Sequence, residues 1–238
     1  MSSPDRQVNS SLGIPALESL WLARWSAYDL ALFGLPLVAA IAALLAFTCR
    51  PWSYFAIVPI VFLLWLISFF RNPPRTIPTE PGAIVSPADG TVTDITPLSH
   101  YDHIGGPAVR IGIFLSIFNV HINRAPVAAR VVDLHYKPGE FLNAMNPASS
   151  ERNESMWIGF EELDGPHRRF AVRQISGLLA RRIVCPLQPG QTVTRGEIFG
   201  MIKLGSRTEL ILPAEAADVL VKPGDPIRAG SHIVARWK

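Results

Sequence analysis

The chain has 238 residues, which is enough for one sizeable domain with an additional anchoring segment. Its formal net charge is only +3 and its basic residues form no concentrated run, so the composition does not indicate a nucleic-acid-binding protein. Hydrophobic residues make up 49% and charged residues 17% of the chain, which is apolar for a soluble protein. The small basic excess suits an anionic membrane surface.

The two cysteines, Cys49 and Cys185, show no motif spacing, and Cys49 lies in an apolar stretch. A disulfide is therefore not expected, and a reducing cytoplasmic compartment is the default expectation.

Residues 1–29 are predicted to form an amphipathic N-terminal segment. Apolar side chains recur there at helical spacing: Leu17, Leu20, Trp21 and Trp25. Tryptophans next to a long apolar run are typical of a membrane-interface anchor, and a surface helix packed on its own domain is an equal alternative. The polar start of the chain does not resemble a signal peptide.

Residues 30–71 are predicted to form a membrane-associating helical hairpin. The stretches 30–49 and 54–70 contain no charged residue, and only Arg50-Pro51-Trp52-Ser53 interrupts them. A helix that crosses a bilayer needs about 20 apolar residues, so both arms are near the required length. A hairpin that dips in from one face, and a hairpin buried in a soluble core, are the alternatives.

The flanking charges predict the orientation of this hairpin. Arginines lie outside both arms, whereas the connector holds only Arg50; the outer arginines are Arg6, Arg24, Arg71 and Arg75. Because basic residues favour the cytoplasmic side, both ends of the hairpin and the rest of the chain are expected on the cytoplasmic face of the cell membrane.

Residues 72–80 are rich in proline and are predicted to be a stiff linker. Residues 81–238 then show short alternating apolar runs between turn residues, which predicts a mainly β (α+β) domain. The expected strands are 83–85, 91–95, 108–118, 127–136 and 168–175, with 178–184 as a short helix or a strand.

Two further features stand out in this domain. Residues 187–200 and 221–234 share the pattern apolar-x-Pro-Gly-x-x-apolar-x-x-Gly before a strand, and they resemble turns of biotinyl/lipoyl-like β-sandwiches. Residues 137–155 have no clear period and carry Phe141 and Leu142, so they form either a functional loop or a disordered excursion.

The step Gly205-Ser206 lies between the two repeated units. A glycine leaves its carbonyl unshielded, so a neighbouring hydroxyl can reach it, although an ordinary turn has the same sequence. A reactive serine needs a base and a group that orients the base. The candidates are His121, where a buried strand ends, and Asp89, in an Ala-Asp-Gly turn. No histidine has the spacing of a metal site, so no metal is expected.

Five motifs in order give this chain a specific resemblance. They are FFRNPPR (69–75), VSPADG (85–90), NVHINRAP (119–126), PGEFLNA (138–144) and GMIKLGSR (200–207). Together they resemble the phosphatidylserine decarboxylase proenzyme family, and most closely its short bacterial and archaeal-type form. The resemblance covers about residues 55–238.

The resemblance implies a precursor that cuts itself. Ser206 would attack Gly205, and the resulting ester would break by β-elimination, giving a large chain 1–205 and a small chain 206–238. Ser206 would become a covalent pyruvoyl group, with Asp89, His121 and Ser206 as the self-cleavage triad. The pyruvoyl ketone would take up the amine of phosphatidylserine and accept the electrons released as CO₂ leaves, giving phosphatidylethanolamine.

Two positions depart from the long form of that family. Arg207 stands where threonine is usual, and Phe118 stands where a second histidine is assigned to decarboxylation. The departure at Phe118 leaves the proton donor of the decarboxylation step open, with His121 as a candidate for both steps. Arg124, Arg152 and Lys137 are candidate contacts for the lipid phosphate, on charge alone.

The implied partners are the lipid substrate, the membrane and the two chains of one precursor, with further self-association left open. The competing functions are a membrane-anchored biotinyl/lipoyl-like module that carries a group on Lys203 or bridges partners, and a pyruvoyl enzyme for a soluble amino acid.

Overall fold

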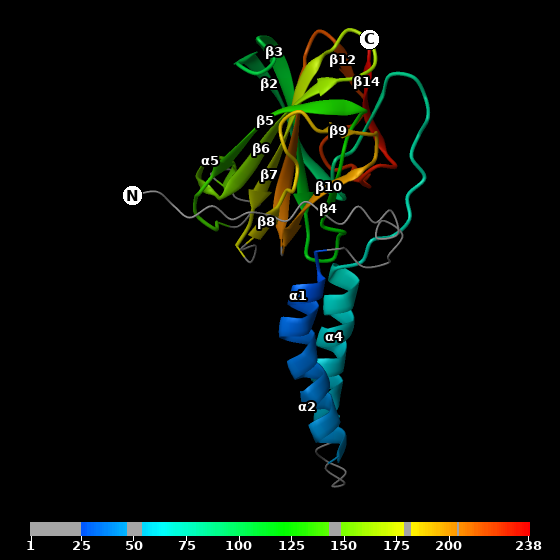
Figure 1. Cartoon of the computed structure of the whole chain (residues 1–238), viewed down its shortest axis with the longest axis vertical. Helices are drawn as coiled ribbons and strands as arrows, with labels where there is room; N and C mark the ends of the chain where they lie inside the picture. Colours follow the sequence, from blue (N-terminus) through cyan, green and yellow to red (C-terminus); the bar gives the residue numbers. More distant parts are fainter. Residues whose placement is uncertain (1–24, 47–53, 143–148, 179–181, 204) are drawn as a thin grey trace.

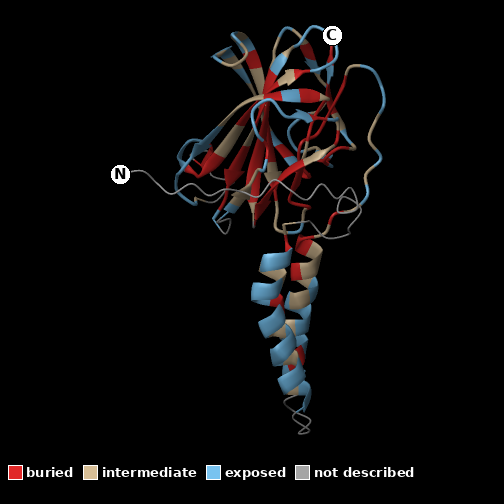
Figure 2. Ribbon diagram, viewed as in Figure 1, coloured by how far each residue is buried: buried red, intermediate tan, exposed pale blue. Residues whose placement is uncertain are grey.

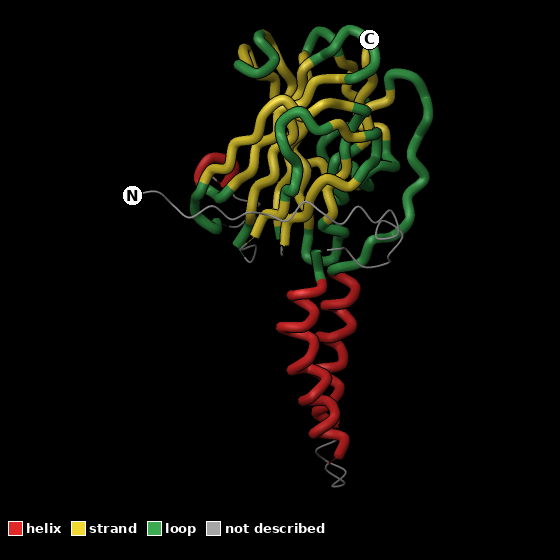
Figure 3. The backbone as a smooth tube through the Cα atoms, viewed as in Figure 1, coloured by secondary structure: helices red, strands yellow, loops and turns green. Residues whose placement is uncertain are grey.

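The computed structural model describes residues 25–46, 54–142, 149–178, 182–203 and 205–238. A pair of apolar helices extends from one end of a β body, as Figure 1 and Figure 3 show. Of residues 1–29, most lie outside the described ranges, and so does the connector 50–53. Of the two cysteines, Cys49 lies outside the described ranges, and Cys185 is a free, partly buried thiol.

The first arm of the hairpin is one continuous helical stretch of 20 residues that is long and apolar enough to cross a membrane. It comprises α1 (Ala27–Asp29), the wider π-helical turn η2 (Leu30–Gly34) and α2 (Leu35–Ala46). The π turn ends two residues before Pro36, whose missing N–H and bulky ring disturb a regular α-helical ladder. The expected apolar first arm is therefore present.

The second arm is shorter, at 16 residues, and consists of η3 (Tyr54–Ala56) and α4 (Ile57–Phe69). Pro59 is tolerated because it lies in the first turn of α4. The arms approach closely at Gly34, where an added Cβ would lie 3.8 Å from Leu63. Figure 2 shows that the sides of both arms are largely exposed, whereas their base at the β body is buried.

The β body contains one large curled antiparallel sheet and two small ones. The large sheet has the order β13-β2-β3-β11-β7-β6-β5-β9. Its strands are β2 (Gly90–Tyr101), β3 (Gly106–Leu115), β5 (Ala129–Lys137), β6 (Ser155–Glu162), β7 (Arg169–Ser176), β9 (Thr192–Val193), β11 (Ser206–Pro213) and β13 (Pro226–Ile227).

The small sheets close the sides of the body, with orders β1-β14-β12 and β4-β10-β8. Their strands are β1 (Ala83–Val85), β4 (Ile122–Arg124), β8 (Arg182–Val184), β10 (Ile198–Lys203), β12 (Ala217–Val219) and β14 (Ile233–Trp237). The body is thus mainly β, as the turn-rich sequence predicted.

Successive side chains of a strand point to opposite faces of the sheet, and this alternation decides which residues form the apolar core. Along β11, Leu210 and Leu212 lie fully buried in the main apolar cluster, whereas Arg207 and Glu209 point to the opposite face of the sheet. The strand expected at 83–85 is confirmed as β1, and the other expected strands correspond to β2, β3, β5 and β7 with shifted ends. Within 178–184 the structure shows a strand, β8.

The repeated units adopt matching structures. Each contains a two-residue strand, β9 or β13, followed by a longer one, β10 or β14. Their first glycines, Gly190 and Gly224, have φ angles of 85° and 95° and donate to the carbonyls of Val131 and Val92. The sequence repeat therefore reflects two similar turns that cap the two halves of the large sheet.

The segment 72–80 contains no helix or strand, but it is not a free tether. Arg195 donates hydrogen bonds to the carbonyls of Pro78 and Glu80 at 2.9 and 3.0 Å. The side chain of Ile77 fills the space beside Gly196 and Gly230, where added Cβ atoms would lie 2.5 and 3.0 Å from it. The segment therefore fixes the hairpin against the β body.

We predict that Gly196→Ala destabilises the protein more than Gly190→Ala. Both glycines have a left-handed φ, so each alanine costs about 1–2 kcal/mol. Only at position 196 does the new Cβ collide with Ile77, which adds about 1–3 kcal/mol of overpacking. Thermal unfolding of the full chain measures both changes. In an Ile77→Ala background the difference between the two substitutions should vanish; a difference that persists would contradict this packing.

Candidate active site

Gly205 and Ser206 lie where the chain passes from one sheet to another. β10 ends at Lys203 in a small sheet, and β11 begins at Ser206 in the large one. Gly205 has φ 71°, a left-handed conformation that suits glycine. Ser206 is fully buried, and among the described residues its hydroxyl has no hydrogen-bond partner. A buried hydroxyl without a partner is costly, which makes Ser206 a candidate functional residue.

His121 lies directly beside this junction, just before β4. Its Nε2 accepts a hydrogen bond from the N–H of Gly205 at 3.2 Å, and its Nδ1 donates to the carbonyl of Asn119 at 3.0 Å. These two bonds assign the neutral Nδ1–H tautomer, in which Nε2 carries the lone pair. The ring of Phe69 covers the imidazole at 4.3 Å between centroids.

Burial sets the protonation of His121. The imidazole is fully buried, and desolvation lowers its pKa to about 4, with the charge of Arg71 acting in the same direction and the Asn119 carbonyl opposing it. His121 is therefore neutral at physiological pH and can act as a base through Nε2.

Asp89 lies in the turn that precedes β2, and the structure does not join it to His121. Its carboxylate accepts bonds from Arg75 Nη2 at 2.8 and 3.0 Å and from the backbone N–H of Ala229 at 2.7 Å. Among the described residues, no hydrogen bond links Asp89 with His121. The turn itself is close to the site, because the carbonyl of Pro87 accepts the N–H of Arg124 at 3.0 Å.

A buried polar cluster surrounds Ser206 on the inner face of the large sheet. Asn123 Nδ2 donates to the Pro87 carbonyl and to Thr208 Oγ1, and its Oδ1 accepts from Gln174 Nε2 at 2.9 Å. All members are fully buried. Gln174 Oε1 and the hydroxyl of Ser176 have no partner among the described residues.

The sheet register places these groups near the junction. Ser176 lies directly opposite Ser206, and Gln174 lies opposite Thr208. Directly opposite side chains are about 5 Å apart and diagonal ones remain within reach of a long side chain. No sequence motif singled out Asn123, Gln174, Ser176 or Thr208 as candidate site residues. Their only signal was polarity at inward positions of otherwise apolar strands.

Arg207 points to the other face of the sheet, where it has a complete set of partners. It donates to Glu209 at 3.0 Å, to Thr93 at 2.8 Å and to Asp94 at 2.7 Å. The space for its guanidinium exists because residue 112 is glycine, where a Cβ would lie 2.1 Å from it. Arg207 thus links β11 to β2 on the face of the sheet opposite Ser206.

The other predicted residues lie outside this cluster. Arg152 pairs with Glu140 at the surface, and Lys137 donates to the carbonyl of Glu151. The loop 137–155 includes α5 (Ser149–Arg152), and Asn153 ties it to the Ser176 carbonyl at 2.7 Å. Phe118 is 69% exposed beside the base of the hairpin. Residues 143–148 lie outside the described ranges.

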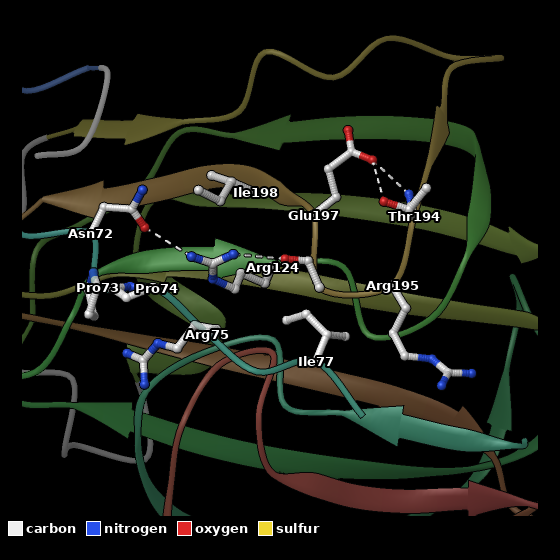
Figure 4. A pocket seen from close by; sticks show the side chains of 11 residues that line it. Asn72, Pro73, Pro74, Arg75, Ile77, Arg124, Thr194, Arg195, Glu197 and Ile198 are labelled. Atoms are coloured by element: carbon white, nitrogen blue, oxygen red, sulfur yellow. Dashed lines mark hydrogen bonds between the residues drawn. The ribbon is translucent and has the colours of Figure 1, made fainter. Parts of the chain in front are cut away.

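Arg124 lines a cavity of about 480 Å³ between the segment 72–77 and the turn 194–198. Its guanidinium donates to Asn72 Oδ1 and to the carbonyl of Gly196, at 2.9 Å each, and Figure 4 shows the bond to Asn72. Neither His121 nor Ser206 lines this cavity. In the described ranges, no group of three or more His, Cys, Asp or Glu side chains is arranged to hold a metal ion.

Comparison with known proteins identifies the family. The family model for phosphatidylserine decarboxylase matches residues 62–235. A phosphatidylserine decarboxylase proenzyme of Carboxydothermus hydrogenoformans is 46% identical over 75% of this chain and 84% of that protein. Proteins of the same name from Rhodopirellula baltica and Chlorobium chlorochromatii are 43% and 45% identical, over 85% and 84% of this chain and 85% and 92% of their own lengths. The chain belongs to the phosphatidylserine decarboxylase family.

Proposed function

We propose that this chain is the precursor of a phosphatidylserine decarboxylase that cuts itself between Gly205 and Ser206 and converts phosphatidylserine to phosphatidylethanolamine. One observation carries the proposal. The buried, unpartnered hydroxyl of Ser206 follows a left-handed glycine whose N–H is bound to a neutral histidine. The relatives' name, proenzyme, is consistent with a self-processed chain.

His121 acts first as the base. Its Nε2 exchanges the Gly205 N–H for the Ser206 hydroxyl and takes the hydroxyl proton, and the oxygen bonds to the Gly205 carbonyl carbon while the peptide C–N bond breaks. The released nitrogen receives the proton, which leaves an ester. Loss of the Ser206 α-proton then expels the Gly205 carboxylate, and hydrolysis releases ammonia. Residue 206 becomes a pyruvoyl group at the start of a 33-residue small chain.

The structure fits such a group at residue 206. β11 is hydrogen-bonded on both sides, with Ser206 opposite Leu115 and Ser176, so the new chain end stays in the sheet after the cut. When formed, the pyruvoyl ketone supplies an electron sink for loss of CO₂ from the serine headgroup of the substrate. Gln174 Oε1 and the Ser176 hydroxyl would accept hydrogen bonds from the substrate amine, because both lack other partners.

His121 also serves the second step in this proposal. The position that carries a histidine in the long form is Phe118, whose exposed ring offers no proton. As a neutral imidazole covered by Phe69, His121 can hold and return a proton within a site that excludes water.

Asp89 has an indirect role in this proposal. The resemblance assigns it to the triad, and in the uncut chain Arg75 and Ala229 hold its carboxylate. We propose that it positions the turn whose Pro87 carbonyl binds Asn123, and that Asn119 orients the His121 ring. The roles of Asp89 and His121 follow from these contacts and from the resemblance.

The hairpin would hold the enzyme at its substrate. Moving a lipid out of the bilayer costs about 0.8 kcal/mol of free energy for each CH₂ that becomes exposed to water. The active site must therefore come to the headgroup. We propose that the hairpin of residues 30–71 inserts into the cell membrane, with the β body on its cytoplasmic face. The same proposal includes a linker at 72–80 and a decarboxylase domain at 81–238. It also includes the division of the precursor into a large chain 1–205 and a small chain 206–238.

The alternative role as a carrier module is not favoured. Lys203, its candidate attachment site, is only 7% exposed and pairs with Asp29, so its amine is not presented to solvent. The repeated turns still support a relation to biotinyl/lipoyl-like sandwiches. We propose that this β body descends from that architecture through its two matching units.

We expect denaturing mass spectrometry of the purified protein to show two chains, of 205 and 33 residues, with a ketone at the start of the smaller one. Ser206→Ala removes the attacking hydroxyl and should leave one intact chain that does not release CO₂ from phosphatidylserine vesicles. Ser176→Ala is the matched control and should still be cut. An intact wild-type chain that is active would contradict the proposal.

The pKa of His121 predicts the pH dependence of cutting. Because the folded-state pKa is about 4, the neutral base is present at all higher pH, so the cutting rate should be flat above roughly pH 5 and fall below it. The same depressed pKa favours the folded state above the unfolded-state pKa of about 6.5, and this stabilisation is lost as the pH falls from about 6.5 to 4.

Freshly synthesised chains moved to buffers of different pH, followed by gel analysis, measure this profile. A fall in rate centred on the ordinary histidine pKa, about 6.5, would show that His121 is not the desolvated base described here.

Gln174 provides a test of the amine-binding assignment. We expect Gln174→Leu to be cut normally but to lose about 10- to 100-fold in kcat, since one hydrogen-bond acceptor of the substrate amine is absent. Titration of the ketone with a hydrazine should show that the pyruvoyl content is unchanged. Gln191→Leu, in an exposed turn, is the control. Loss of cutting in Gln174→Leu would place Gln174 in the first step and contradict the assignment.

A further inference from the structure

The first arm of the hairpin holds the strand that leads into the cut bond. Lys203 is the last residue of β10 and lies two residues before Gly205. Its Nζ forms an ion pair with Asp29 of α1 and contacts the carbonyl of Trp25 at 3.5 Å. The side chains of Lys203 and Asp29 are only 8% and 15% exposed. A buried charge pair holds its two partners together, because separating them would leave each charge buried without compensation.

The second arm holds the base of the same reaction. Phe69, the last residue of α4, is fully buried and packs on the ring of His121. Arg71 Nη2 donates to the Phe118 carbonyl at 2.8 Å, which fixes the segment that leads to His121. The base of the hairpin therefore contacts the histidine on one side and the strand before the cut bond on the other.

The geometry of the attack depends on both contacts. Ser206 is fixed by the large sheet, whereas the Gly205 carbonyl belongs to the segment that extends from β10. The hydroxyl and the carbonyl thus approach each other from two different sheets. In such an arrangement a misplacement of about 1 Å can lower a rate by about 100-fold.

We propose that Asp29 and Lys203 are positioning residues for self-cleavage, so that the hairpin is part of the cutting site as well as the membrane anchor. This inference rests on the proposed cut at Gly205-Ser206. The ion pair holds β10 at the hairpin and places the Gly205 carbonyl in reach of the Ser206 hydroxyl. Both residues remain in the large chain after the cut, so the pair also keeps the new chain end beside the site.

The pair can be tested by charge exchange in the full-length protein. Asp29→Asn keeps the shape and removes the charge, and it should slow cutting by about 10- to 100-fold in cell-free synthesis with vesicles. Asp29→Glu should cut at a rate near wild type, and the double exchange Asp29→Lys with Lys203→Asp should recover most of what either single change loses. Glu80→Gln, which breaks an exposed ion pair with Arg236 on the β body, should leave the rate unchanged.

A second readout separates positioning from folding. Each Asp29 change is placed in the uncut Ser206→Ala chain, and its thermal unfolding is compared with that of Ser206→Ala alone. Slow cutting with an unchanged unfolding midpoint supports positioning, and so does recovery by the double exchange. Cutting of Asp29→Asn at the wild-type rate would overturn the inference. Cutting of Asp29→Glu as slow as that of Asp29→Asn would overturn it as well. Absence of cutting in the unmodified chain would instead refute the proposed function.

Discussion

The passage of the chain between two sheets is the constraint on which the rest of the site depends. β10 and β11 are consecutive strands, yet they pair in different sheets, and only residues 204 and 205 connect them. A left-handed glycine makes this turn without steric cost. The same turn leaves the Gly205 carbonyl without a neighbouring Cβ and directs its N–H to His121. One local backbone requirement thus places the Gly205 carbonyl next to the Ser206 side chain and its N–H on the imidazole of His121.

The polar groups around this turn have two different functions. On the outer face, Arg207 pairs with Asp94 and Glu209, so these side chains hold β11 in register behind Ser206. On the inner face, Gln174, Ser176 and Ser206 each keep one unpartnered atom among the described residues. Buried unpaired groups cost free energy, and proteins retain them where a reaction or a ligand uses them. The contrast between the faces explains why Arg207 does not disturb the inner site.

Local sequence patterns predicted the frame of this fold, because turns and short strands depend on nearby residues. The matching glycines at 190 and 224 and the apolar arms of the hairpin are of this kind. Contacts between distant segments were not predictable. The partner of Asp89 is Arg75 from the proline-rich segment, and no spacing rule connects them. Gln174 and Asn123 form a bond only because β4 and β7 meet in three dimensions. The strand β6 went unpredicted because it follows a long irregular stretch.

The rigid attachment of the hairpin has a consequence for a reaction on lipids. Ile77 and Arg195 fasten the segment 72–80 to the β body, and Phe69 and Asp29 fasten both arms beside the site. A flexible tether would let the site sample many heights above the bilayer, so binding of a lipid headgroup would cost the free energy of ordering the tether. In the proposed membrane-inserted state, the fixed base would set His121 and residue 206 at one height, next to the exposed Phe118. The contacts proposed to align the Gly205-Ser206 bond for cutting would therefore also align the mature site with the headgroup layer.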